Sequence, residues 1–185
     1  MISTNDARPG MALDLPDGLY TIVEQQHVKP GKGKAFVRIK LKKVGTGQVV
    51  DRTFRAGEDV PQAIIETRDH QFLYRDDLGY HFMNLEDYSQ IVLHADDVGA
   101  AADYMLDGST VKVTMYEGTA LGVSLPAAVE LEVTYAEPGV KGDTRTGATK
   151  SVTVETGLSV QVPLFVEQGQ RIKVDTRNGE YLTRV

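Results

Sequence analysis

The sequence contains neither cysteine nor tryptophan among its 185 residues. Without cysteine the chain can form no disulfide, thiolate metal site or cysteine nucleophile, which fits a reducing compartment. No stretch approaches the roughly 20 apolar residues that a membrane-spanning helix needs, and the N-terminus shows no basic patch followed by an apolar run. We therefore expect a cytoplasmic protein with no membrane partner.

The motifs that usually carry catalysis or hold metals are missing as well. The histidines lack H-x-x-x-H and H-E-x-x-H spacing, which argues against a zinc site. There is no G-x-S-x-G motif, and the Gly-rich segment at 29–34 lacks the spacing of a P-loop. Adjacent acids such as Asp76 and Asp77 would point to opposite faces of a strand and are more typical of turns and caps. We expect neither an enzyme nor a bound metal or cofactor.

Charge is distributed unevenly along the chain. The formal net charge of −6 argues weakly against a nucleic-acid partner, because affinity for phosphates usually depends on excess lysine and arginine. Residues 27–43, however, hold seven basic residues and no acid, whereas residues 58–107 hold 12 acids and two arginines. Such a polarised chain can meet a polyanion with one end. Chance clustering of surface charges is the alternative interpretation.

Alternation of apolar and polar residues predicts an all-β fold. In the segment 35–42, Phe36 or Val37 would share the buried face with Ile39 and Leu41. Asp96–Tyr104 is the best helix candidate, with Asp96 or Asp97 as N-cap, and 58–64 suggests one short helical turn. The other strands are predicted at 18–24, 48–54, 66–74, 80–84, 89–93, 111–116, 128–135, 150–155, 160–165 and 171–175.

Short strands separated by Gly, Asp and Asn turns are typical of small barrels or sandwiches. Breaks are plausible near 60–63 and 125–127, and about five strand signals fall in each resulting unit of about 60 residues. We therefore predict three domains, 1–62, 63–126 and 127–185, each the size of an SH3-like or oligonucleotide-binding (OB) barrel.

A lysine-rich turn is the segment best suited to a binding or chemical role. Lys32 lies between Gly31 and Gly33, which permit backbone conformations closed to other residues, and Pro30 stiffens the approach. Its ammonium group would project from a hairpin tip, where it could enter a negatively charged crevice or be covalently modified. On composition alone, an ordinary turn with solvated lysines is the more common outcome.

Several separated segments, in order along the whole chain, resemble the bacterial translation elongation factor P family. They are MISTNDARPG at 1–10, KPGKGKAF at 29–36, ETR at 66–68, FLY at 72–74, FMN at 82–84 with Tyr88, PGVKGDT at 138–144, KSVTVETGLSVQVPLFVEQG at 150–169, VDTR at 174–177, and GEY at 179–181 with Arg184.

The resemblance implies three small β-barrel domains in an L-shaped arrangement: an SH3-like, KOW-type head followed by two OB-like barrels. It implies a monomeric elongation factor that binds the 70S ribosome between the P and E sites. There it would promote peptide-bond formation on ribosomes stalled at consecutive prolines, and it would not itself be an enzyme.

The resemblance also implies roles for individual residues. Lys32 matches the family's tip lysine, which reaches toward the peptidyl-transferase centre and in several bacteria is extended by a lysine-modifying enzyme. The expected RNA contacts are Lys29, Pro30, Gly31, Gly33, Lys34 and Arg38 beside P-site peptidyl-tRNA and ribosomal RNA; Gly142, Asp143 and Thr144 at the E-site messenger codon; and Tyr181 and Arg184 near small-subunit RNA.

Two other interpretations remain at this stage. An OB-type module that binds single-stranded nucleic acid without a translation role would need exposed aromatic residues along a basic groove, and aromatics are only 7% of the chain. A β-barrel interaction protein whose lysine loop is merely a turn would also fit the composition. Co-sedimentation with ribosomes would separate the interaction protein from both nucleic-acid binders.

Overall fold

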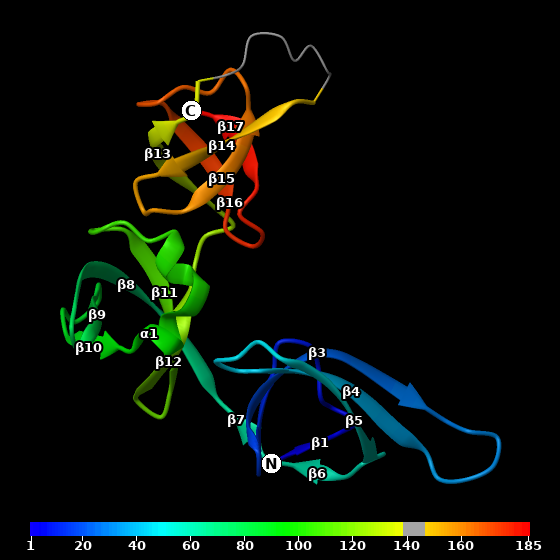
Figure 1. The fold of residues 1–185 in the computed structure, drawn as a ribbon. Helices are drawn as coiled ribbons and strands as arrows, with labels where there is room; N and C mark the ends of the chain where they lie inside the picture. The colour runs from blue at the N-terminus through cyan, green and yellow to red at the C-terminus, as the bar shows by residue number, and fades with distance from the viewer. Residues whose placement is uncertain (139–146) are drawn as a thin grey trace. The chain divides into compact units, whose positions relative to one another are not determined.

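The computed structural model describes residues 1–138 and 147–185, and in these residues the chain is almost entirely β-structure (Figure 1). The strands form three five-stranded sheets and one two-stranded pair. This confirms the prediction of an all-β protein built from small barrel-like sheets. The chain forms two compact units, residues 1–68 with 113–122 and residues 69–112 with 123–185. The boundaries 1–62, 63–126 and 127–185 and the L-shaped arrangement stay predictions.

The first sheet has the strand order β5-β4-β3-β2-β7. Its strands are β2 (Ala12–Leu15), β3 (Gly18–Val28), β4 (Phe36–Lys43), β5 (Val49–Arg55) and β7 (Gln62–Ala63), with β1 (Ile2–Ser3) paired to β6 (Asp59–Val60) alongside. In β4 the inward residues are Val37, Ile39 and Leu41, each fully buried, so Val37 rather than Phe36 sets the buried face. Burying each such side chain contributes roughly 1.5–3 kcal/mol to stability.

A β-bulge interrupts the pairing of β3 with β4. Ile22 pairs with Leu41 and Glu24 with Lys40, so the register shifts by one residue at Val23. Because directly paired residues share a face of the sheet, Ile22 faces the core, whereas Glu24 and Gln26 face outward beside Lys40 and Arg38.

The second sheet has the strand order β10-β9-β8-β11-β12. Its strands are β8 (Ile65–Asp76), β9 (Gly79–Asn84), β10 (Gln90–Leu93), β11 (Thr110–Tyr116) and β12 (Thr119–Ser124). The Phe72 ring packs at a tilt on those of Tyr80 and Phe82, with centroids 5.8 and 5.4 Å away. Offset and tilted aromatic contacts of this kind add to the stabilisation from burial alone.

The third sheet has the strand order β15-β14-β13-β16-β17. Its strands are β13 (Ala128–Ala136), β14 (Thr149–Val154), β15 (Ser159–Pro163), β16 (Arg171–Asp175) and β17 (Tyr181–Arg184). Alternate positions of neighbouring strands fill its core, which includes Leu131, Val152, Val162 and Ile172, all at most 1% exposed. The strands that the period-2 pattern predicts at 128–135, 150–155, 160–165 and 171–175 are therefore confirmed as β13 to β16.

The expectation of a helix at 96–104 was only partly right. The predicted helix is present as α1 (Ala95–Val98) and a 3₁₀ turn, η1 (Gly99–Asp103). The N-cap of α1 is His94 rather than Asp96 or Asp97. Asp96 and Asp97 lie in the first turn instead, where their negative charges interact favourably with the positive end of the helix dipole. Gly99 ends the α-helical geometry with a φ of 57°. No helix in the described part of the chain is long and apolar enough to cross a membrane.

The helical turn expected at 58–64 is wrong. This segment is extended and supplies β6 and β7, which flank Pro61. Proline disfavours helical geometry in the preceding residue, and both short strands gain ladder partners, Val60 with Ile2 and Ala63 with Ala12.

Candidate nucleic-acid interface

A long hairpin carries the predicted lysine loop. The ladder between β3 and β4 ends at the Val28–Phe36 pair, and the hairpin extends beyond the other strands of its sheet (Figure 1). Residues 29–34 are all exposed. Gly33 has a φ of 114°, which an L-residue rarely adopts, so its predicted role is confirmed. Gly31 has no positive φ, so its backbone needs no special freedom.

The three lysines of this loop are uncompensated. Within residues 1–138 and 147–185, no side chain forms an ion pair or hydrogen bond with the ammonium group of Lys29, Lys32 or Lys34. An exposed, unpaired ammonium on a flexible stem can follow an approaching anion or accept a modifying group. The loop is therefore a cationic tip, with Lys32 at its centre.

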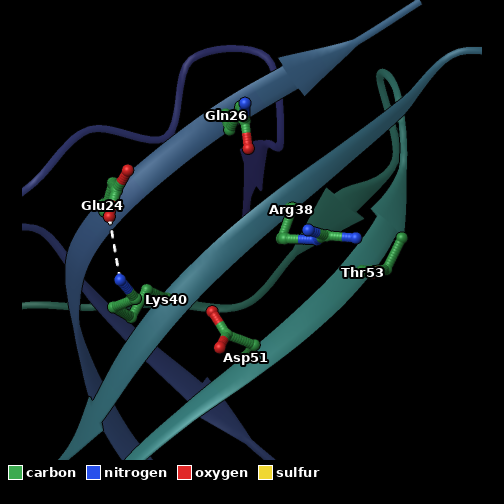
Figure 2. A pocket seen from close by; sticks show the side chains of 6 residues that line it. All are labelled: Glu24, Gln26, Arg38, Lys40, Asp51 and Thr53. Atoms are coloured by element: carbon green, nitrogen blue, oxygen red, sulfur yellow. Dashed lines mark hydrogen bonds and ion pairs between the residues drawn. The ribbon is translucent and has the colours of Figure 1, made fainter.

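The outward face of the hairpin carries a polar groove of about 440 Å³ across β3, β4 and β5 (Figure 2). The Lys40 ammonium binds the Glu24 carboxylate at 3.0 Å. That hydrogen bond, followed by the charges of Glu24 and Asp51, raises the pKa of Lys40. Arg38 differs from Lys40, because its guanidinium has no hydrogen bond or ion pair within the described residues. The groove is lined by Glu24, Gln26, Arg38, Lys40, Asp51 and Thr53.

The barrel end of the hairpin is anchored by a compact cluster. Asp17, in the turn between β2 and β3, accepts hydrogen bonds from the Tyr20 hydroxyl at 2.7 Å and from the Arg52 guanidinium on β5. These two hydrogen bonds, that of Tyr20 first, lower the pKa of Asp17 to about 2. The Arg52 guanidinium also lies 5.1 Å from the centroid of the Tyr20 ring. The hairpin is thus fixed at its base and free of side-chain ion pairs at its tip.

The C-terminal residues singled out by the sequence lie on β17. A register shift there pairs Tyr181 with Val174 and Arg184 with Ile172, which places both on the face that the two buried residues share. Tyr181 packs partly against the core. The Arg184 guanidinium lies 5.6 Å from the centroid of the exposed Phe165 ring. Gly142, Asp143 and Thr144 lie outside the described residues.

The acidic segment uses several of its carboxylates in turns. Asp76 accepts hydrogen bonds from the backbone N–H groups of Leu78 and Gly79 and binds His81 at 2.8 Å. The neighbouring His81 imidazole is the largest cause that lowers the pKa of Asp76. The prediction of turn chemistry for Asp76 is confirmed. No cluster of three or more metal-ligating side chains occurs in the part of the chain that the structure describes.

Sequence reasoning found the loop and Arg38 but missed Gln26 and Thr53. Both are direct cross-strand partners of Arg38, one on each side. The only signal for them is strand register, which a bulge shifts and which no local motif marks.

Comparison with known proteins agrees with this architecture. A translation initiation factor eIF-5A family protein from Naegleria fowleri superposes with a TM-score of 0.52 at 19% identity, covering 67% of this chain and 96% of that one. Three family models match in succession: the elongation factor P KOW-like domain over residues 3–60, the elongation factor P OB domain over 65–123, and the elongation factor P C-terminal domain over 129–184. The chain is thus a modular protein of KOW-like and OB-type barrels.

The sequence relatives narrow that class. Elongation factor P of Acidothermus cellulolyticus is 54% identical over all of this chain and 98% of its own length. Elongation factor P of Clavibacter michiganensis is 52% identical over all of this chain and 99% of its own length. The chain belongs to the elongation factor P family, and its role is that of a translation elongation factor. This membership sets aside a nucleic-acid-binding module without a translation role.

Proposed function

We propose that this chain binds the ribosome between its P and E sites and promotes peptide-bond formation on ribosomes stalled at consecutive prolines. One structural observation carries the proposal: Lys32 presents an ammonium group at an exposed hairpin tip, with no partner in the described residues. In a chain of this family, such a tip can enter the RNA-walled space at the peptidyl-transferase centre.

In this proposal the protein positions the reacting groups and takes no chemical part in the reaction. Proline is a poor nucleophile in peptide-bond formation because its ring restricts the geometry of attack. Holding the acceptor end of the P-site tRNA in place would restore aligned attack, an entropic contribution to catalysis. Bond formation itself stays with ribosomal RNA, so the proposal makes the protein a cytoplasmic, monomeric factor without cofactor and not an enzyme.

The proposed RNA contacts follow from charge and exposure. Lys29 and Lys34 flank Lys32 in the loop, and Arg38 continues the basic face along β4. Pro30, Gly31 and Gly33 shape the loop that would approach tRNA and ribosomal RNA. Contacts to phosphates release counterions, so affinity for the ribosome should fall as salt rises. Tyr181 and Arg184 are proposed to meet small-subunit RNA, and Gly142, Asp143 and Thr144 the E-site messenger codon.

Replacing Lys32 by alanine tests the proposed role of the tip. Lys32→Ala should keep the fold, because the side chain is exposed and unpaired, and should abolish the rescue of polyproline synthesis in a reconstituted translation assay. Lys42→Ala is a matched control that removes the same charge from an exposed position on β4, and it should retain rescue. Full rescue by Lys32→Ala would refute the role.

The proposal includes a lysine-modifying enzyme that acts on Lys32. The accessibility of Lys32 supports this, since no neighbouring side chain in the described residues covers or pairs with its ammonium group. The intact mass of the protein purified from its native host, followed by peptide mapping across Lys29–Arg38, should show added mass on Lys32. An unmodified mass would leave the positional role intact and remove the enzyme from the list of partners.

A further inference from the structure

The outward side chains of the hairpin and of β5 form three cross-strand rows. The row nearest the barrel is Glu24, Lys40 and Asp51; the second is Gln26, Arg38 and Thr53; the third is Val28, Phe36 and Arg55. Counting one lysine against two acids in the first row, and one arginine in each of the others, gives formal charges of −1, +1 and +1. Beyond the third row the loop adds Lys29, Lys32 and Lys34.

The charge thus rises along the hairpin toward its tip and changes sign between the first and second rows. Lys40 does not extend the positive surface into the first row, because Glu24 binds it at 3.0 Å and Asp51 acts on it electrostatically. Arg38 has no such partner within the described residues, so its charge is available to a ligand.

The second row also has suitable geometry for an anion. Figure 2 shows Arg38 between Gln26 on β3 and Thr53 on β5, with its guanidinium directed toward the Thr53 side of the groove. A guanidinium offers paired N–H donors, an amide offers two more and a hydroxyl one. A planar guanidinium with neutral donors around it matches the oxygens of a phosphate group.

We infer that Gln26, Arg38 and Thr53 form a binding site for one backbone phosphate of RNA, and that Glu24 and Asp51 mark the end of the RNA path along the hairpin. The inference rests on the proposed function, since it takes the ligand from the RNA that the tip would meet. It adds two neutral ligands and a boundary to a surface otherwise described only by its basic residues.

The salt dependence of the affinity distinguishes a neutral hydrogen bond to a phosphate from a charged contact with it. Removing one charge contact to an RNA phosphate lowers the slope of log affinity against log salt by about 0.7–0.9, whereas removing a neutral hydrogen bond leaves the slope unchanged. Losing a hydrogen bond to a charged group weakens binding by about tenfold. The test uses Arg38→Gln and the near-isosteric Thr53→Val, which touches no core residue because Thr53 is exposed.

The experiment measures the dissociation constant of full-length protein for ribosomes stalled on proline codons, across a salt series. Arg38→Gln should weaken binding and lower the salt slope, and Thr53→Val should weaken it about tenfold at an unchanged slope. Thr21→Val, on β3 outside the groove, is the matched control and should bind as the wild type does. Asp51→Asn should tighten binding, because it leaves the Lys40 charge less compensated.

Wild-type affinity of Thr53→Val would overturn the inference, since Arg38 would then act by charge alone. A photoreactive residue at position 26 should crosslink to RNA, and a crosslink only to a ribosomal protein would equally overturn it. The experiment distinguishes failure of the proposed function from failure of the phosphate site. If the wild-type protein fails to bind stalled ribosomes or to rescue them, the proposed function is wrong. If the wild-type protein succeeds and Thr53→Val binds equally well, only the phosphate site is wrong.

Discussion

Replacing Gly79 by alanine should destabilise the second sheet strongly. Gly79 begins β9 with a φ of 136°, and a Cβ there would overlap the carbonyl oxygen of Leu93 and lie 3.1 Å from its carbonyl carbon and 3.3 Å from Cγ1 of Val92. The clash is with backbone, which cannot rotate away as a flexible side chain can. Forcing alanine into a left-handed conformation costs roughly 1–2 kcal/mol, and overpacking costs a further 1–3 kcal/mol or so.

The expected loss is therefore about 2–5 kcal/mol, a large share of the stability of a small domain. At roughly 4–8 °C per kcal/mol for a domain of this size, the unfolding midpoint of the second sheet should fall by at least about 8 °C. Thermal unfolding followed by circular dichroism measures the shift. Hydrogen exchange of the amides in β9 and β10 should show that the loss is local to these strands.

Gly118→Ala is the matched control for this experiment. Gly118 has a φ of 79°, but a Cβ there would have nothing within 4 Å, so it incurs only the backbone cost of about 1–2 kcal/mol. The difference between the two variants isolates the close approach to Leu93. Equal losses for Gly79→Ala and Gly118→Ala would show that the strand pair adjusts freely and that the steric reasoning is wrong.

Two further predictions concern the third sheet. Hydrogen bonds from the Arg177 side chain, and then from its backbone N–H, hold the pKa of Asp175 at about 2 instead of 3.8. The stability that this carboxylate contributes should therefore be complete above about pH 4 and should fall as the pH drops toward 2, which urea midpoints across this window would show. A fall of equal size in Arg177→Gln would contradict the assignment. Leu131 is fully buried, so Leu131→Ala should cost about 2–5 kcal/mol in urea unfolding, whereas a cost under about 1 kcal/mol would mean that the core collapses around the missing atoms.

Most of the longer strands were predictable from sequence because one face of each sheet is buried, although β2, β12 and β17 were not among the strands predicted. In β4 the buried Val37, Ile39 and Leu41 alternate with outward residues, and that period is readable without any neighbour. The two-residue strands β1, β6 and β7 were not predictable, since they exist only through partners distant along the chain, such as Ile2 with Val60. The N-cap of α1 was missed because acids in a first turn and acids at the cap look alike in sequence.

The candidate site likewise has one part that the sequence predicts and one part that it does not. The exposed tip around Lys32 follows from local composition, because glycine and proline mark the turn and nothing apolar surrounds it. That Lys40 is compensated while Arg38 is not depends on which residues of β3 and β5 stand opposite them. That pairing depends on register, and no motif in the sequence encodes it.

The bulge at Val23 determines how this hairpin tolerates insertions and deletions. Deleting Val23 would keep Ile22 opposite Leu41 and Glu24 opposite Lys40 and would remove only the bulge, whereas deleting Gln25 would bring Gln26 opposite Ile39 and exchange the two faces of the outer hairpin. Changes in the number of loop residues between Val28 and Phe36 would leave those faces untouched and alter only how far the lysines reach. Length variation among related chains should therefore be confined to the loop and to the bulge, while the paired part of the strand keeps an invariant residue count.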